Sequence, residues 1–259
     1  MMGESDMIND ASQNYKRTIG LNRDQIKYIA MFLMLLNHIS IIFLEPGTFL
    51  SELFLDLGYF TAITMCYFLV EGYQYTHSKK KYASRLLIFA LISEIPFCLA
   101  FTEEGIIEFH GLNMMFTLFL CFGILVVHER VASKLLRIAC TIGLIIPSLI
   151  SDWALLAPIF TLLFIRSYGS KSKTKNAFII AMILFGITEF VAKSSLLPFK
   201  ENLIYTLGSL LGILLAGISI VYLYNGKRMK GGRELSKWFF YVFYPGHLLV
   251  LGLIRIFLV

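Results

Sequence analysis

Apolar residues along this chain form long blocks that are separated by short polar connections. A helix rises about 1.5 Å per residue, so about 20 apolar residues cross the roughly 30 Å hydrocarbon core of a bilayer. Nine blocks close to this length fall near 26–44, 54–73, 84–101, 112–128, 135–150, 152–167, 177–193, 202–224 and 238–258. The pattern predicts an all-α, polytopic integral membrane protein with about nine transmembrane helices.

The amino-acid composition supports this prediction. Of the 259 residues, 57% are hydrophobic and 15% are charged, whereas about 25% of the residues of a soluble domain are charged. The cysteines all lie inside apolar blocks, so we expect small core residues and not a disulfide framework or a metal site. These cysteines are Cys66, Cys98, Cys121 and Cys140.

The charges alternate from one connection to the next. Most of the 23 Lys and Arg precede the first block or follow the second, fourth, sixth and eighth, and the other connections are acidic or nearly uncharged. By the positive-inside rule, this distribution predicts a cytoplasmic N-terminus and an external C-terminus. The net charge of +6 thus marks a cytosolic face, and we expect no nucleic-acid partner.

The domain organisation predicted from this pattern is simple. Residues 1–22 are largely polar and have no basic region before an early apolar core, which indicates a disordered cytosolic tail and not a signal peptide. Residues 23–259 show no internal repeat and no soluble domain, so they are predicted to form a single transmembrane domain.

Three titratable side chains are predicted to lie near the middle of the bilayer. Ionisable groups at this depth are costly and are candidates for function. His38 follows Lys27 by eleven residues, which is close to three helical turns and about 16 Å, so both should lie on one face of their helix. Glu94 and His247 lie about ten residues inside their own spans. Helices one, three and nine should therefore contribute to one polar layer.

This layer and the cations below it suggest a chemistry. A neutral imidazole in a low-dielectric setting is a competent general base, and a carboxylate such as Glu94 can orient it. Cytosolic cations suit a phosphorylated donor. The residues at this cytosolic end are Lys27, Glu71, Tyr75, Lys80, Lys81 and Arg85. Two other interpretations of the buried groups remain: they form hydrogen bonds to neighbouring helices, or they relay protons in a transporter. The lysine run can also serve only to set the membrane topology.

Four segments closely resemble the TraX family of multi-span bacterial inner-membrane proteins, which are named for the N-terminal acetylation of conjugative pilin. They are KYIAMFLMLLNHI (27–39), the long segment from FLVEGYQYTH to FCLAF (68–101), NMMFTL (113–118) and FYPGHLLVL (243–251). The resemblance spans most of residues 25–255. It implies a multi-pass protein of the bacterial inner membrane, distantly similar to transmembrane acyltransferases.

The resemblance also implies a reaction and a set of residues. The donor would be acetyl-CoA bound from the cytosol, and His38 would be the acyl-transfer centre, eleven positions after the basic residue Lys27. Glu94, His247 and Asn37 would support it, Asn37 standing where the family often has Asp. The acceptor would be an amine of a pilin-like peptide or a small molecule. The alternatives are a proton-coupled permease and an assembly factor of a conjugation or secretion system.

Overall fold

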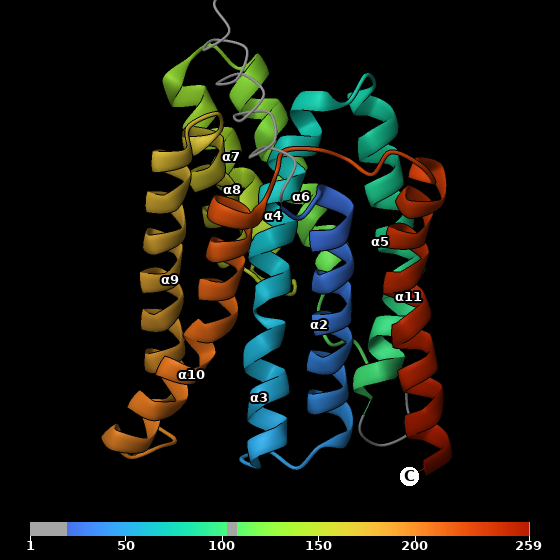
Figure 1. The fold of residues 1–259 in the computed structure, drawn as a ribbon, viewed down its shortest axis with the longest axis vertical. Helices are drawn as coiled ribbons and strands as arrows, with labels where there is room; N and C mark the ends of the chain where they lie inside the picture. The colour runs from blue at the N-terminus through green and yellow to red at the C-terminus, as the bar shows by residue number, and fades with distance from the viewer. Residues whose placement is uncertain (1–19, 103–107, 259) are drawn as a thin grey trace, which may run out of the picture.

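The computed structural model describes residues 20–102 and 108–258. Most of the predicted tail, residues 1–19, lies outside this range. Within it, the chain forms helices and turns with two isolated bridges and no strand. The helices, seen in Figure 1, are α2 (Arg23–Phe43), α3 (Phe49–Gly58), α4 (Phe60–Tyr75), α5 (Lys79–Phe101), α6 (Met114–Arg130), α7 (Lys134–Ser148), α8 (Leu156–Ser167), α9 (Lys171–Lys193), α10 (Phe199–Ile218), the π-helical turn η1 (Ser219–Leu223) and α11 (Arg233–Leu258).

Six helical segments of the described chain are long and apolar enough to cross a bilayer. They are Arg23–Phe43, Phe49–Tyr75, Lys79–Phe101, Lys171–Lys193, Phe199–Leu223 and Glu234–Phe257. The prediction of an all-α, polytopic membrane protein is confirmed. The fourth, fifth and sixth apolar blocks are also helical, but α6, α7 and α8 have 17, 15 and 12 residues. The orientation across the membrane stays a prediction.

Polar capping residues explain where several helices begin. The Asn22 side chain accepts a hydrogen bond from the backbone N–H of Gln25, and the Gln25 side chain accepts one from the backbone N–H of Asn22. This capping box satisfies N–H groups that the first turn of α2 leaves free. Side chains also cap α5, α6, α7 and α9, at Ser78, Asn113, Ser133 and Ser170.

The helices pack as a bundle in which distant parts of the sequence are neighbours. Figure 1 shows α9 and α10 on one side of α2 and α3, and α5 with α11 on the other. The N-terminal ends of α2 and α11 lie together, because the Arg23 N–H donates to the Lys227 carbonyl oxygen (2.9 Å) and Ser236 donates to Asp24 (2.9 Å). The last helix thereby packs against the first and the third predicted spans.

Glycine allows the closest of these helix contacts. A Cβ atom on Gly212 of α10 would lie 2.4 Å from the Asp56 carbonyl oxygen and 2.6 Å from the Phe60 backbone nitrogen. Small residues at helix crossings let membrane helices approach closely and gain packing energy. Gly212 therefore holds α10 against the junction of α3 and α4.

A short connection between α7 and α8 is folded against the segment that precedes α6. The N–H of Leu112 donates to the Ile150 carbonyl (2.8 Å), and the N–H of Asp152 donates to the Leu112 carbonyl (2.7 Å). Trp153 has φ of 58°, a left-handed conformation that is uncommon for a residue other than glycine. These bonds hold residues 149–155 beside the start of α6, where they reach the cavity described next.

Candidate active site

A cavity of about 1120 Å³ lies inside the bundle. Residues of α2, α3, α4, α5, α6, α8, α9 and α11 and of the connection 149–155 line its walls. Its lining extends along α2 from Arg23 to Ile41, a rise of roughly 27 Å at 1.5 Å per residue. A space this large takes a ligand the size of a nucleotide cofactor.

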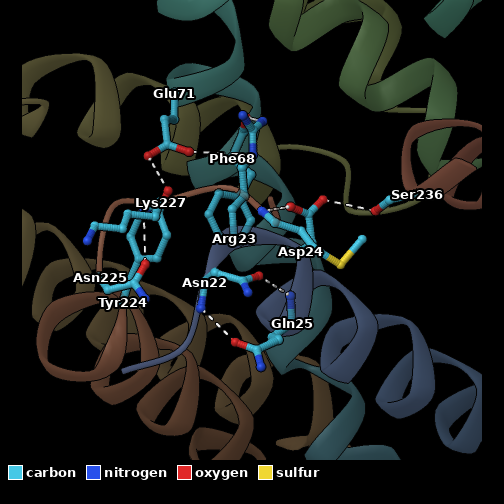
Figure 2. Close-up of polar contacts among 11 residues, drawn as sticks. Asn22, Arg23, Asp24, Gln25, Phe68, Glu71, Tyr224, Asn225, Lys227 and Ser236 are labelled. Atoms are coloured by element: carbon cyan, nitrogen blue, oxygen red, sulfur yellow. Dashed lines mark hydrogen bonds and ion pairs between the residues drawn. The ribbon is translucent and has the colours of Figure 1, made fainter. Parts of the chain in front are cut away.

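One end of the cavity is rich in cations. Its lining there includes Arg23, Lys27, Arg85, Arg228 and Lys237. These residues come from the N-terminal halves of α2, α5 and α11 and from the segment before α11, which Figure 2 shows at the start of α2. Clustered cations in a concave site attract a polyanion such as a set of phosphates.

Lys27 and Arg85 lie over aromatic rings, as do Arg23 and Lys237. The Lys27 Nζ atom is 4.9 Å from the centroid of Phe240, and the Arg85 guanidinium is 5.7 Å from that of Tyr82. Among the described residues, no carboxylate lies within salt-bridge distance of either cation. Both charges therefore remain available to a ligand.

Arg23 and Glu71 form a buried ion pair, with 3.5 Å between Nε and Oε2. Arg23 also donates to the carbonyl of Phe68 (3.1 Å), and the Tyr224 hydroxyl donates to Glu71 (2.8 Å), as Figure 2 shows. Glu71 is not among the residues that line the cavity. In this structure Glu71, predicted as a donor-binding residue, joins α2 and α4 to the end of η1.

The other predicted donor-binding residues divide between the cavity and the surface. Tyr75 lines the cavity. Lys80 and Lys81 are exposed in the first turn of α5 and do not line the cavity. Among the described residues, the lysine run is therefore not part of the cationic end of the cavity.

The second feature of the site is a pair of histidines in hydrogen-bond contact. His38 Nδ1 and His247 Nε2 are 2.7 Å apart, and the rings stack with centroids 5.0 Å apart. His247 Nδ1 lies 2.8 Å from the Phe243 carbonyl oxygen. Packing of α11 against α2 brings these two residues together from opposite ends of the chain.

The Phe243 carbonyl defines the proton positions when both rings are neutral. A carbonyl only accepts, so His247 Nδ1 must carry a proton and His247 Nε2 must be the acceptor. His38 Nδ1 therefore donates to His247, and the lone pair of His38 lies on Nε2. An unprotonated ring nitrogen is the form of histidine that acts as a base or a nucleophile.

The two histidines differ in their access to the cavity. Both side chains are 7% exposed, but His38 lines the cavity and His247 does not. Among the described residues, no hydrogen bond to His38 Nε2 is formed. His38 can therefore contact a ligand in the cavity. His247 contacts the Nδ1 side of the His38 ring.

Within the described part of the chain, Glu94 forms no hydrogen bond or salt bridge with either histidine. Its Oε2 atom accepts hydrogen bonds from the Asn113 side chain (2.6 Å) and backbone N–H (3.3 Å). Asn113 caps α6, and the positive end of a helix dipole stabilises a carboxylate nearby. The structure therefore does not support Glu94 as the group that orients His38: the Glu94 carboxylate bonds Asn113 at the start of α6, and His247 is in hydrogen-bond contact with His38.

Asn37 lies beside His38 on the cavity wall. Its side-chain amide donates to the Leu55 carbonyl (3.1 Å), which joins α2 to α3. A Cβ atom on Gly58 would lie 2.2 Å from the Asn37 Cβ, so glycine is required for this contact. One amide proton and the carbonyl oxygen of Asn37 form no hydrogen bond with the described residues and can meet a ligand in the cavity.

Several lining residues were not recognised as site residues from the sequence. Asp152 and Trp153 form a polar-aromatic pair between two apolar blocks, which is the one local signal that marks them. In the sequence, Arg228 and Lys237 were interpreted only as positive charges that set the membrane topology. All four lie at or near connections, so hydropathy alone does not indicate that they reach an internal cavity.

The fold and site together define a multi-pass helical membrane protein with a histidine-bearing internal cavity. The chain belongs to the TraX family, because the family described as TraX protein matches residues 22–255. A relative from Dichelobacter nodosus, the "Probable fimbrial assembly protein FimC, serogroup H1", is 31% identical over 254 residues, covering 93% of this chain and 99% of the relative. No solved structure matches the chain.

Proposed function

We propose that this protein is a membrane-embedded acyltransferase that moves an acetyl group from acetyl-CoA to an amine. The observation that carries the proposal is the free Nε2 of His38 on the wall of a cavity whose other end is cationic. A base and an anion-binding region in one enclosed space suit a donor that carries both phosphates and a reactive carbonyl.

The dimensions of the cavity support an acyl-CoA donor. Lys27 and His38 line the same cavity and are about 16 Å apart along α2. Acyl-CoA separates its phosphates from its thioester by a long flexible arm, so the two ends can reach these two regions together. Lys27, Arg85 and Arg228 would bind phosphates, and the thioester would lie near His38.

The chemistry that His38 would perform is general base and acid catalysis. A neutral amine attacks the thioester carbonyl while His38 Nε2 takes a proton from the attacking nitrogen. The carbon–sulfur bond then breaks, and the His38 imidazolium returns that proton to the departing thiolate. His247 holds the ring in the required tautomer, and Asn37 polarises the carbonyl.

The relative suggests a biological setting. Its printed name describes a probable fimbrial assembly protein, and fimbriae are built from protein subunits. We propose that this chain acts in the cell membrane of a bacterium, in pilus or conjugation-related assembly, and that its acceptor is the amine of a pilin-like peptide or a small molecule.

Binding and cleavage of acetyl-CoA by the purified protein test the proposal. Purified protein in detergent should gain about 2.7 kcal/mol of stability when acetyl-CoA is present at 100 times its Kd, measured as a rise in melting temperature. Thiol release from acetyl-CoA should also appear when a short peptide with a free α-amine is added. A melting temperature that is indifferent to acetyl-CoA, together with no thiol release, contradicts the proposal and favours the permease or assembly alternatives.

The donor site has a matched pair of variants. Lys27→Met removes a cation that lines the cavity, and we expect the Kd for acetyl-CoA to rise about tenfold or more. Lys80→Met removes an exposed cation outside the cavity and should leave the Kd unchanged. Equal weakening by both variants would place the phosphates elsewhere than at the cationic end.

A further inference from the structure

The carboxylates that line the cavity divide into two groups. Asp24 and Glu234 belong to the cationic end, where Asp24 accepts hydrogen bonds from Met229 and Ser236 and Glu234 pairs with Lys237. The other two lining carboxylates, Asp152 and Glu189, come from the 149–155 connection and from α9. The cavity therefore carries opposite charges in two regions.

Asp152 is the carboxylate of the second region that has no cationic partner. Glu189 pairs with Lys193 at 3.0 Å, whereas no lysine or arginine among the described residues forms a salt bridge with Asp152. A carboxylate in a largely apolar enclosure is costly unless a cation or hydrogen-bond donor meets it. A ligand with a positive charge would supply that partner.

Contacts on two sides place Asp152 in the His38 region of the cavity. On one side, the Asp152 N–H bonds the Leu112 carbonyl, and the N–H of nearby Met114 donates to the Tyr244 hydroxyl (3.1 Å). The Tyr244 ring centroid is 5.8 Å from that of His247. On the other, the Trp153 ring lies 5.9 Å from that of Tyr59. Tyr59 directly follows Gly58, on which Asn37 packs. The connection thus borders the same part of the cavity as the histidine pair.

Hydrogen bonds hold the backbone around Asp152, and its carboxylate accepts one from the Trp153 N–H but pairs with no cation among the described residues. Its N–H donates to the Leu112 carbonyl (2.7 Å), and its carbonyl accepts from the Thr117 hydroxyl (2.6 Å). A binding group whose backbone is fixed by surrounding bonds needs little reordering when a ligand arrives.

His38 provides an independent indication that a ligand binds in this region. Its side chain is 7% exposed, and its Nε2 has no hydrogen-bond partner among the described residues. Because His38 lines the cavity, a ligand or water in the cavity can supply the hydrogen-bond partner of Nε2. His38 Nε2 and the Asp152 carboxylate thus belong to one cavity, and among the described residues no cation pairs with the carboxylate.

We infer that Asp152 binds the acceptor as a protonated primary amine and positions it against His38. This inference rests on the proposed acetyl transfer and names its acceptor class and specificity residue. The bound ammonium releases one proton to solvent before it attacks. His38 takes the second proton as the carbon–nitrogen bond forms, and returns it to the thiolate as the carbon–sulfur bond breaks. The products are an N-acetyl amine and CoA.

The experiment compares Asp152→Asn with wild type by using two acceptors, a dipeptide with a free α-amine and its analogue with a hydroxyl in place of that amine. Asp152→Asn removes the charge and keeps the size of the side chain. We expect the KM for the amine to rise at least tenfold, with a smaller change in kcat. The hydroxyl analogue should bind wild type much more weakly than the amine does. In Asp152→Asn, the hydroxyl analogue and the amine should bind about equally tightly.

Two controls keep this test decisive. Glu201→Gln removes an exposed carboxylate that does not line the cavity, and it should leave the KM unchanged. Asp152→Glu keeps the charge and should restore most of the preference for the amine. Stabilisation by acetyl-CoA reports separately on folding and on the donor site, and it should be equal in all these variants.

The outcomes distinguish this inference from the function on which it rests. Acetyl transfer by wild type with an unchanged KM and an unchanged amine preference in Asp152→Asn overturns the role of Asp152 and leaves the acyltransferase intact. Loss of acetyl-CoA stabilisation in Asp152→Asn also overturns that role, because the residue would then support the donor site or the fold. Absence of transfer in wild type overturns both proposals.

Discussion

At the scale of single residues, the most informative contact is the hydrogen bond between His38 and His247. Because His247 also bonds the Phe243 carbonyl, the free lone pair of His38 is directed to Nε2 and not to Nδ1. Burial disfavours the charged form of an imidazole, and two charged imidazoles in contact repel each other, so both effects favour the neutral pair. A neutral, oriented base is thereby obtained without a carboxylate.

Replacement of His247 tests this arrangement. In His247→Phe the ring size is roughly kept but the acceptor for His38 Nδ1 is lost, so both tautomers of His38 become accessible. We expect acetyl transfer to fall about 10- to 100-fold, as for other groups that orient a reactive histidine, with an unchanged Kd for acetyl-CoA. Transfer at the wild-type rate would show that His38 needs no orienting partner.

The same residues show what the sequence could predict. The depths of His38 and His247 follow from counting residues along helices, so their common layer was predictable. Which of His247 and Glu94 would meet His38 was not predictable, because it depends on how α11 packs and on the need of α6 for a cap at Asn113. Asn113 carries no charge, so it did not stand out in the sequence.

At the scale of elements, the helices follow the apolar blocks but differ from them at the ends. The first block was predicted to begin at residue 26, and α2 begins at Arg23 because Asn22 caps it. The second block divides into α3 and α4 at Tyr59. That division places Gly58 beside Asn37, and it is set by packing between helices, which hydropathy does not report.

Glycines allow a direct test of the helix packing. Gly212→Ala should lower the melting temperature in detergent, because the added Cβ would lie 2.4 Å from the Asp56 carbonyl oxygen and overpacking costs about 1–3 kcal/mol. Gly143→Ala in α7 is the matched control, since nothing lies within 4 Å of its added Cβ. It should leave the melting temperature equal or raised, because alanine favours a helix. Equal destabilisation by both variants would contradict the packing of α10.

At the scale of the whole molecule, the bundle holds a large cavity with cations in one region and with His38 and Asp152 in another. Composition and charge alternation predict the membrane bundle, because they depend on averages over whole segments. They do not predict the cavity, because Arg228 and Asp152 belong to connections that fold back onto helices. A donor and an acceptor of opposite charge would thus bind in separate regions and meet near His38.

The central claim is that His38 is the general base of acetyl transfer, and His38→Gln tests it most directly. Glutamine keeps a polar side chain of similar reach but is no base, and His128→Gln is the control because His128 does not line the cavity. Thiol release from acetyl-CoA in the presence of a peptide amine should fall about 10²- to 10⁴-fold in His38→Gln, while acetyl-CoA still raises its melting temperature and His128→Gln behaves as wild type. Thiol release at the wild-type rate in His38→Gln would contradict the claim.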